Sequence, residues 1–245
     1  MTTALMLHRA DGAPLSTAFR QAALSPDDPF AQEREIAWEG PNAMSTGRAS
    51  FVGKRDVASF PHTETLAVVD GELTLTAPGS APHVIGPGSG AVIASGTAVR
   101  IEAAAGVRFV FCAAACDTST TPTTPGFIPL HADADFKPSG GPAPEVLLGP
   151  APQCRSDNVF TDEQTQYRAG TWDSTPYHRV VRPHPVNEFM VVLDGGVRFA
   201  TPASPDGSAL SVSAGDAIFV PQGASIGWES TERVAKFYVV QNAQA

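Results

Sequence analysis

The sequence predicts an all-β protein built from two small antiparallel barrels that derive from one internal repeat. Three observations support this fold class. Gly and Pro number 22 each in 245 residues, which favours many short strands joined by turns over long helices. Apolar residues make up 42% of the chain and charged residues 17%, which allows a large core without disulfide or metal support. The third observation is that two stretches of the chain repeat one strand-turn-strand pattern.

The repeat is clearest around an Asp-Gly turn. AVVDGELTL at 67–75 and VVLDGGVRF at 191–199 each have an apolar run, an Asp-Gly pair and an alternating segment, which predicts two equivalent hairpins. Glu64 and Glu188 each lie seven residues before the turn glycine, so the offset between the halves is 124 at both landmarks. Two landmarks at one offset indicate a real, diverged repeat.

The similarity continues along both halves. Residues 90–98 resemble residues 216–224, and residues 108–111 resemble residues 236–239, with offsets of about 126 and 128. Small insertions account for the drift, the first of them in the turn-rich loop at 201–209.

Three segments follow from the repeat. Residues 1–115 are expected to form an N-terminal barrel with an N-terminal extension, residues 116–150 an inter-barrel linker, and residues 151–245 a C-terminal barrel. The linker is assigned because it is rich in Thr, Pro, Gly and Asp. Closing each sheet into a barrel removes its exposed edges. A single large β-sandwich is the alternative fold, because it would share most of these signals.

Charge and hydropathy argue against two classes of partner. The net charge is −9 and Lys and Arg do not cluster, which disfavours nucleic acid. No window approaches the roughly 18 consecutive apolar residues that cross a bilayer, and the N-terminus lacks a leader pattern. We therefore expect a cytoplasmic protein that binds neither nucleic acid nor a membrane.

The second half carries two short motifs. RPHPVNEFMVVLDG has a histidine, a glutamate and a glycine at 184, 188 and 195, and GDAIFVPQGASIGW has glycine, proline and glycine at 215, 221 and 223. With these spacings the second half resembles the cupin family, whose barrels are double-stranded β-helices or jelly rolls. The segments IGWES and GTWDSTP are similar to the branch that includes ethanolamine-utilisation-type cupins and ureidoglycine aminohydrolases.

The resemblance implies a metal site, but its ligands are incomplete here. A typical cupin holds Fe, Mn, Zn or Ni with three histidines and a glutamate. Arg182 and Ile226 stand where two of those histidines are expected, so His184 and Glu188 are the remaining candidate metal ligands. Two ligands bind a divalent metal weakly, and the guanidinium of Arg182 would repel it. We expect no certain cofactor and retain Mn, Fe, Ni or Zn as candidates.

Without a metal, Arg182, His184 and Glu188 would form a polar cluster inside an apolar barrel, which is typical of a small-molecule site. Arg182 would bind a carboxylate, and the neighbouring histidine or glutamate could act as an acid or a base. The alternative is an internal Arg182–Glu188 ion pair that satisfies itself. Large aromatic residues flank the two motifs and are candidate pocket walls: Trp172, Tyr177 and Trp228.

The first half lacks most of these residues. It keeps Glu64, but Ala58 and Phe60 stand where Arg182 and His184 stand in the second half. We expect a degenerate, structural barrel that covers its neighbour or forms a homodimer interface.

These features leave more than one class of function open. The first is a bicupin that binds a small polar or carboxylate-bearing metabolite in the C-terminal barrel, without an intact metal site. The second, which the resemblance implies, is a metal-dependent hydrolase, isomerase or oxygenase of small amino-acid or ureide-like substrates. A scaffold role as a homodimer is the third.

Overall fold

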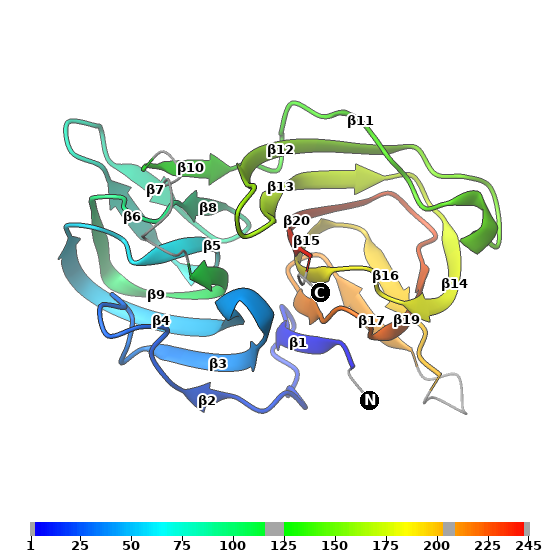
Figure 1. The fold of residues 1–245 in the computed structure, drawn as a ribbon, viewed down its shortest axis with the longest axis horizontal. Helices are drawn as coiled ribbons and strands as arrows, with labels where there is room; N and C mark the ends of the chain where they lie inside the picture. Colours follow the sequence, from blue (N-terminus) through cyan, green and yellow to red (C-terminus); the bar gives the residue numbers. More distant parts are fainter. Residues whose placement is uncertain (1–2, 116–124, 203–208, 243–245) are drawn as a thin grey trace.

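The computed structural model describes residues 3–115, 125–202 and 209–242 (Figure 1). Neighbouring strands pair antiparallel, and the helices in these ranges are two short 3-10 turns, Pro41–Ala43 and Pro144–Val146. In the same ranges there is no helix long and apolar enough to cross a membrane. The predicted all-β fold is confirmed.

One sheet forms the N-terminal barrel, coloured blue to green in Figure 1. Its main path runs β10-β8-β5-β9-β4-β3-β2, and β6 and β7 pair with each other beside it. Its strands are β2 (Arg20–Gln21), β3 (Arg34–Glu39), β4 (Met44–Val57), β5 (His62–Gly71), β6 (Leu73–Thr76), β7 (His83–Ile85), β8 (Gly90–Ile93), β9 (Val99–Ala115) and β10 (Phe127–Leu130). The strands enclose an apolar core rich in phenylalanine.

Two sheets form the C-terminal barrel. The larger runs β1-β18-β15-β20-β13-β12-β11 and the smaller runs β14-β19-β16-β17. Their strands are β1 (Leu5–His8), β11 (Lys137–Ser139), β12 (Cys154–Asp162), β13 (Tyr167–Ser174), β14 (His178–Pro183), β15 (Asn187–Asp194), β16 (Gly196–Phe199), β17 (Leu210–Ser213), β18 (Ala217–Val220), β19 (Ser225–Glu229) and β20 (Val234–Gln241). A second apolar core lies inside this barrel.

Strand pairing crosses the segment boundaries expected from the sequence. The N-terminal strand β1 pairs with β18, with Leu5 opposite Phe219, so it extends the C-terminal barrel rather than the N-terminal one. Inside the expected linker, β10 pairs with β8 of the first barrel and β11 pairs with β12 of the second. Residues 116–124 of that linker lie outside the described residues.

The turn glycines of the repeat are required by geometry. Gly71 has φ +77° and Gly195 has φ +72°, the left-handed region that favours glycine. A Cβ at Gly71 would lie 2.2 Å from the carbonyl oxygen of Gly106, and a Cβ at Gly195 would lie 2.0 Å from that of Arg233. No other residue fits either position without a backbone shift.

The pairing register corrects the offsets expected further along the repeat. Glu64 and Glu188 are 124 residues apart, and their partners Ala113 on β9 and Val240 on β20 are 127 apart. The same offset of 127 relates β8 to β18. The sequence comparison gave about 126 and 128, so each of those alignments is wrong by one residue. A slip of one residue assigns every side chain of a strand to the opposite face.

A third core joins the two barrels along the faces of β5, β9, β13 and β20. Tyr167 on β13 reaches across it. Its hydroxyl lies 2.8 Å from the carbonyl oxygen of Cys112 and 2.8 Å from the hydroxyl of Thr65, and it accepts a hydrogen bond from the Thr65 N–H at 3.1 Å. The two barrels therefore share buried apolar surface and buried polar contacts.

Candidate functional site

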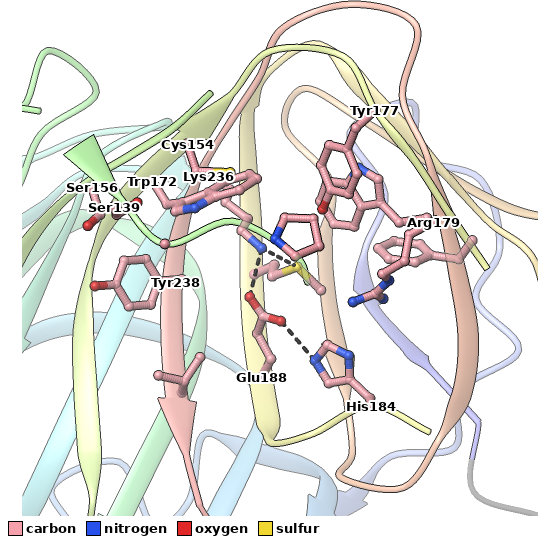
Figure 2. A pocket seen from close by; sticks show the side chains of 16 residues that line it. Ser139, Cys154, Ser156, Trp172, Tyr177, Arg179, His184, Glu188, Lys236 and Tyr238 are labelled. Atoms are coloured by element: carbon pink, nitrogen blue, oxygen red, sulfur yellow. Dashed lines mark hydrogen bonds and ion pairs between the residues drawn. The ribbon is translucent and has the colours of Figure 1, made fainter. Parts of the chain in front are cut away.

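A cavity of about 310 Å³ opens inside the C-terminal barrel (Figure 2). One wall is aromatic, because Trp172 on β13, Tyr177 before β14 and Trp228 on β19 all line it. The rings of Tyr177 and Trp228 stack with centroids 5.4 Å apart, and Trp172 meets Trp228 edge-on at 6.0 Å. These three residues were expected as pocket walls, and the structure places all of them there.

The polar floor of the cavity is built around Glu188 on β15. Its Oε1 accepts a hydrogen bond from Lys236 Nζ at 2.7 Å, and its Oε2 lies 2.9 Å from His184 Nε2. Burial alone would raise the pKa of the Glu188 carboxyl, but the ammonium of Lys236 and the hydrogen bond from His184 outweigh it and hold that pKa well below its usual range. Glu188 is thus a carboxylate across the physiological pH range.

Lys236 on β20 is enclosed on several sides. Its Nζ lies 3.1 Å from the sulfur of Met190, 4.7 Å from the ring centroid of Trp172 and 5.1 Å from that of Trp228. Ring faces attract a cation, so the aromatic wall and Glu188 together hold the ammonium in place (Figure 2).

Arg179 on β14 supplies a second cation to the cavity wall. Its Nε and Nη2 are buried, and among the described residues neither has a hydrogen-bond partner. The Nδ1 of His184 is also buried and has no partner among them. Figure 2 shows the guanidinium of Arg179 directed toward the part of the cavity that the His184 ring lines. Unpaired buried polar groups are costly, so three in one cavity make it the candidate ligand site of this barrel.

Arg182 does not line the cavity. It is partly exposed on the same strand as Arg179, and Glu188 is paired with Lys236 and His184 instead of with Arg182. The strand β14 has a bulge between Arg179 and Arg182, where two residues of β14 oppose one residue of β19. The motif position selected Arg182, but Arg182 pairs with Ile226, which does not line the cavity, whereas the bulge places Arg179 opposite the cavity-lining Trp228.

Lys236 was not found from the sequence. The alignment of residues 108–111 with residues 236–239 matched Lys236 to the surface residue Arg108. The strand register instead matches Lys236 to Phe109, because the two residues pair with equivalent positions on β15 and β5. Phe109 is fully buried, so this position faces the interior in both barrels. The available signal was a single lysine within the apolar run VAKFYVV, because a charge in a central strand needs a partner.

The residues of the cavity do not fit a cupin metal ion. His184 and Glu188 lie together as expected, but no group of three or more His, Cys, Asp or Glu side chains suited to a metal occurs among the described residues. Ile226, at the position of the missing histidine, is buried apolar core. The ammonium of Lys236 bonds directly to Glu188, so the carboxylate already has a cation.

The N-terminal barrel contains a closed counterpart of this arrangement. Arg34 on β3 is fully buried, and its Nε donates to Asp28 at 2.7 Å while its Nη2 and Nη1 donate to Glu64 at 2.5 and 3.2 Å. His62 Nε2 lies 2.8 Å from Glu64, and the guanidinium stacks 4.3 Å from the ring of Phe111. The charged groups of this cluster pair with one another, and the Nδ1 of His62 is buried without a partner among the described residues.

The fold and both motif regions define a protein of two cupin barrels. A family model described as the EutQ-like cupin domain matches residues 161–238. A solved structure of a protein of unknown function of the DUF861 family, from Pseudomonas syringae pv. tomato, is 38% identical, covers 98% of this chain and 100% of its own, and superposes with a TM-score of 0.91. The chain belongs to this DUF861 family of cupins.

More distant structures share the fold alone. The cupin 2 conserved barrel domain protein from Leptotrichia buccalis is 13% identical, with 84% of this chain and 87% of that one covered and a TM-score of 0.59. Protein Ylba from E. coli, also of the DUF861 family, is 10% identical, with 100% and 93% covered and a TM-score of 0.54. No curated protein matches the sequence.

Proposed function

We propose that the C-terminal barrel binds a small metabolite that carries a carboxylate, and that Arg179 anchors it without a metal ion. The observation that carries the proposal is the free edge of the Arg179 guanidinium. Nε and Nη2 lie on one side of that planar group, and both are buried without a partner among the described residues. Two parallel N–H donors match the two oxygens of a carboxylate, and such bidentate pairs are the strong ones.

The charges in the cavity wall suit a ligand with one negative charge. Arg179 and Lys236 are cations, and Glu188 is an anion that Lys236 already neutralises. The remaining positive charge is that of Arg179. The aromatic wall offers a surface for the apolar body of the ligand, which is the usual composition of a small-molecule pocket.

A metal-dependent hydrolase, isomerase or oxygenase is the other function that the family resemblance implies. We do not propose it, because the donor set of the cavity lacks two of the four expected ligands and its carboxylate is bound to Lys236.

The test is calorimetric titration of the full-length protein with phenylacetate, a carboxylate with an aromatic body. Arg179→Gln is expected to weaken binding roughly tenfold to a hundredfold, because a charge-assisted hydrogen-bond pair is lost. Arg182→Gln removes a charge three residues away on the same strand and is the matched control, with unchanged binding expected. Equal binding by wild type and Arg179→Gln, or a loss confined to Arg182→Gln, would overturn the assignment.

A further inference from the structure

We infer that the ligand of this cavity is a 2-hydroxy carboxylate, whose hydroxyl donates a hydrogen bond to His184 Nδ1 while its carboxylate is held by Arg179. This inference rests on the proposed function and narrows the class of ligand. It follows from the third unpaired atom of the cavity, the buried Nδ1 of His184.

The hydrogen bond at the other ring nitrogen fixes what Nδ1 can do. An ionised carboxylate only accepts hydrogen bonds, and Glu188 lies 2.9 Å from His184 Nε2, so Nε2 carries the proton and donates. In the neutral imidazole the second nitrogen then has a lone pair and accepts. The low pKa of Glu188, which results from Lys236 and His184 outweighing burial, keeps the carboxylate in its accepting form. In this tautomer of the neutral ring, the buried His184 Nδ1 is an acceptor, and a donor on the ligand would pair with it.

The backbone holds the ring in this position. The His184 N–H donates to the carbonyl of Ala224 at 2.9 Å, and the Gly223 N–H donates to the carbonyl of His184 at 2.8 Å. These bonds tie the start of the β14–β15 connection to the turn before β19, so the imidazole is a fixed element of the wall. Its Nδ1 and the free edge of Arg179 border one cavity (Figure 2).

Other substituents beside the carboxylate fit less well. A 2-oxo group offers only acceptors, which leaves His184 Nδ1 unpaired. A 2-ammonium group can donate, but it would bring a third positive charge into a cavity that already holds Arg179 and Lys236 against the single negative charge of Glu188. An unsubstituted acid leaves Nδ1 buried and unsatisfied. A hydroxyl donates without adding charge.

The test compares four acids that differ in one substituent: phenylacetate, mandelate as both enantiomers, phenylglyoxylate and phenylglycine. Each is titrated calorimetrically into the wild-type protein in mildly alkaline buffer. One enantiomer of mandelate is expected to bind about tenfold more tightly than phenylacetate, because it gains one buried hydrogen bond, and phenylglyoxylate and phenylglycine are expected to bind more weakly than mandelate.

His184→Phe tests the partner of the hydroxyl. Phe60 occupies the equivalent place in the N-terminal barrel and makes the same two backbone hydrogen bonds. Its N–H donates to the carbonyl of Thr97 at 2.8 Å, and its carbonyl accepts from the Gly96 N–H at 2.8 Å. The variant is expected to bind mandelate and phenylacetate equally. Because the four acids are first compared on wild type, the outcome does not depend on the variant folding.

The outcomes separate this inference from the proposed function. Tight mandelate binding that depends on His184 supports both. Equal affinity of wild type for mandelate and phenylacetate, or tightest binding of phenylglyoxylate, overturns the hydroxy-acid inference and leaves the carboxylate site standing. Failure of all four acids to bind overturns the proposed function and this inference with it.

Discussion

In the N-terminal barrel Glu64 is bound by an arginine from β3, whereas in the C-terminal barrel the equivalent Glu188 is bound by a lysine from β20. The strand register shows what was exchanged. Arg34 pairs with Ala49, which pairs with Phe109 on β9. In the C-terminal barrel Ser156 pairs with Trp172, which pairs with Lys236 on β20. Because Phe109 and Lys236 are counterparts, Ser156 is the counterpart of Arg34. A small side chain thus stands in the C-terminal barrel where the large guanidinium stands in the N-terminal one.

This exchange accounts for a closed interior in one barrel and a cavity in the other. Arg34 is fully buried and fills the space between Asp28, Glu64 and Phe111. Ser156, by contrast, lines the cavity. The motif glutamate is therefore part of a filled ion-pair cluster in one barrel and the floor of a cavity in the other, depending on which strand supplies the cation.

The largest effect is expected from removing the cation of the closed barrel. Arg34→Met leaves the carboxylates of Asp28 and Glu64 buried without it, and breaking such a pair costs about 3–5 kcal/mol. Urea denaturation measures this loss. Arg100→Met breaks the exposed pair with Asp56 and is the control, with an unchanged midpoint expected. A variant Arg34→Met as stable as wild type would contradict the description of the first barrel.

A smaller loss is expected from the same change in the open barrel. Lys236→Met removes the cation beside Glu188, whose side chain is 13% exposed next to a cavity that water can enter. The remaining carboxylate is partly solvated and keeps its bond to His184, so we expect a loss of roughly 1–3 kcal/mol in the same urea experiment. A loss larger than that of Arg34→Met would reverse the proposed contrast between the barrels.

A smaller effect is expected in the pH dependence of the free energy of unfolding, to which the Glu188 ion pair contributes. The folded pKa of Glu188 lies below the ordinary 4.5, because Lys236 and His184 outweigh burial. The unfolded chain therefore takes up this proton first, and stability that is present above about pH 4.5 is lost as the pH falls toward the folded pKa. Glu188→Gln should flatten this decline in urea unfolding measured between about pH 5 and 3. The exposed Glu72→Gln is the control, and equal slopes for Glu188→Gln and wild type would refute the ion pair.

Much of the fold and part of the site could be predicted from the sequence. The Asp-Gly turns, the alternating segments and the offset of 124 identified the repeat, and motif spacing brought His184 and Glu188 together. The aromatic walls were found because they flank those motifs. The spacing from glutamate to turn glycine is the same in both halves because each carries a register shift at the same place, between Val68 and Asp70 and between Val192 and Asp194.

The cations of the site were missed for reasons of strand geometry. Arg182 was selected because it occupies the position of a motif histidine, but the bulge in β14 places Arg179 opposite the cavity-lining Trp228. An error of one residue in the repeat alignment matched Lys236 to a surface position, so it was not recognised as an interior residue. The pairing of β1 with β18 joins segments more than 200 residues apart, and no short pattern in either segment specifies it.

We infer that Lys236 takes the place of a metal ion beside Glu188, because its ammonium lies 2.7 Å from the carboxylate. This inference is tested most directly by plasma mass spectrometry of the untagged, full-length protein after incubation with Mn, Fe, Ni and Zn and removal of free ions. We expect far less than one metal ion per chain for every metal. About one tightly bound ion per chain would contradict it, because His184 and Glu188 would then hold a metal in the place assigned to the lysine.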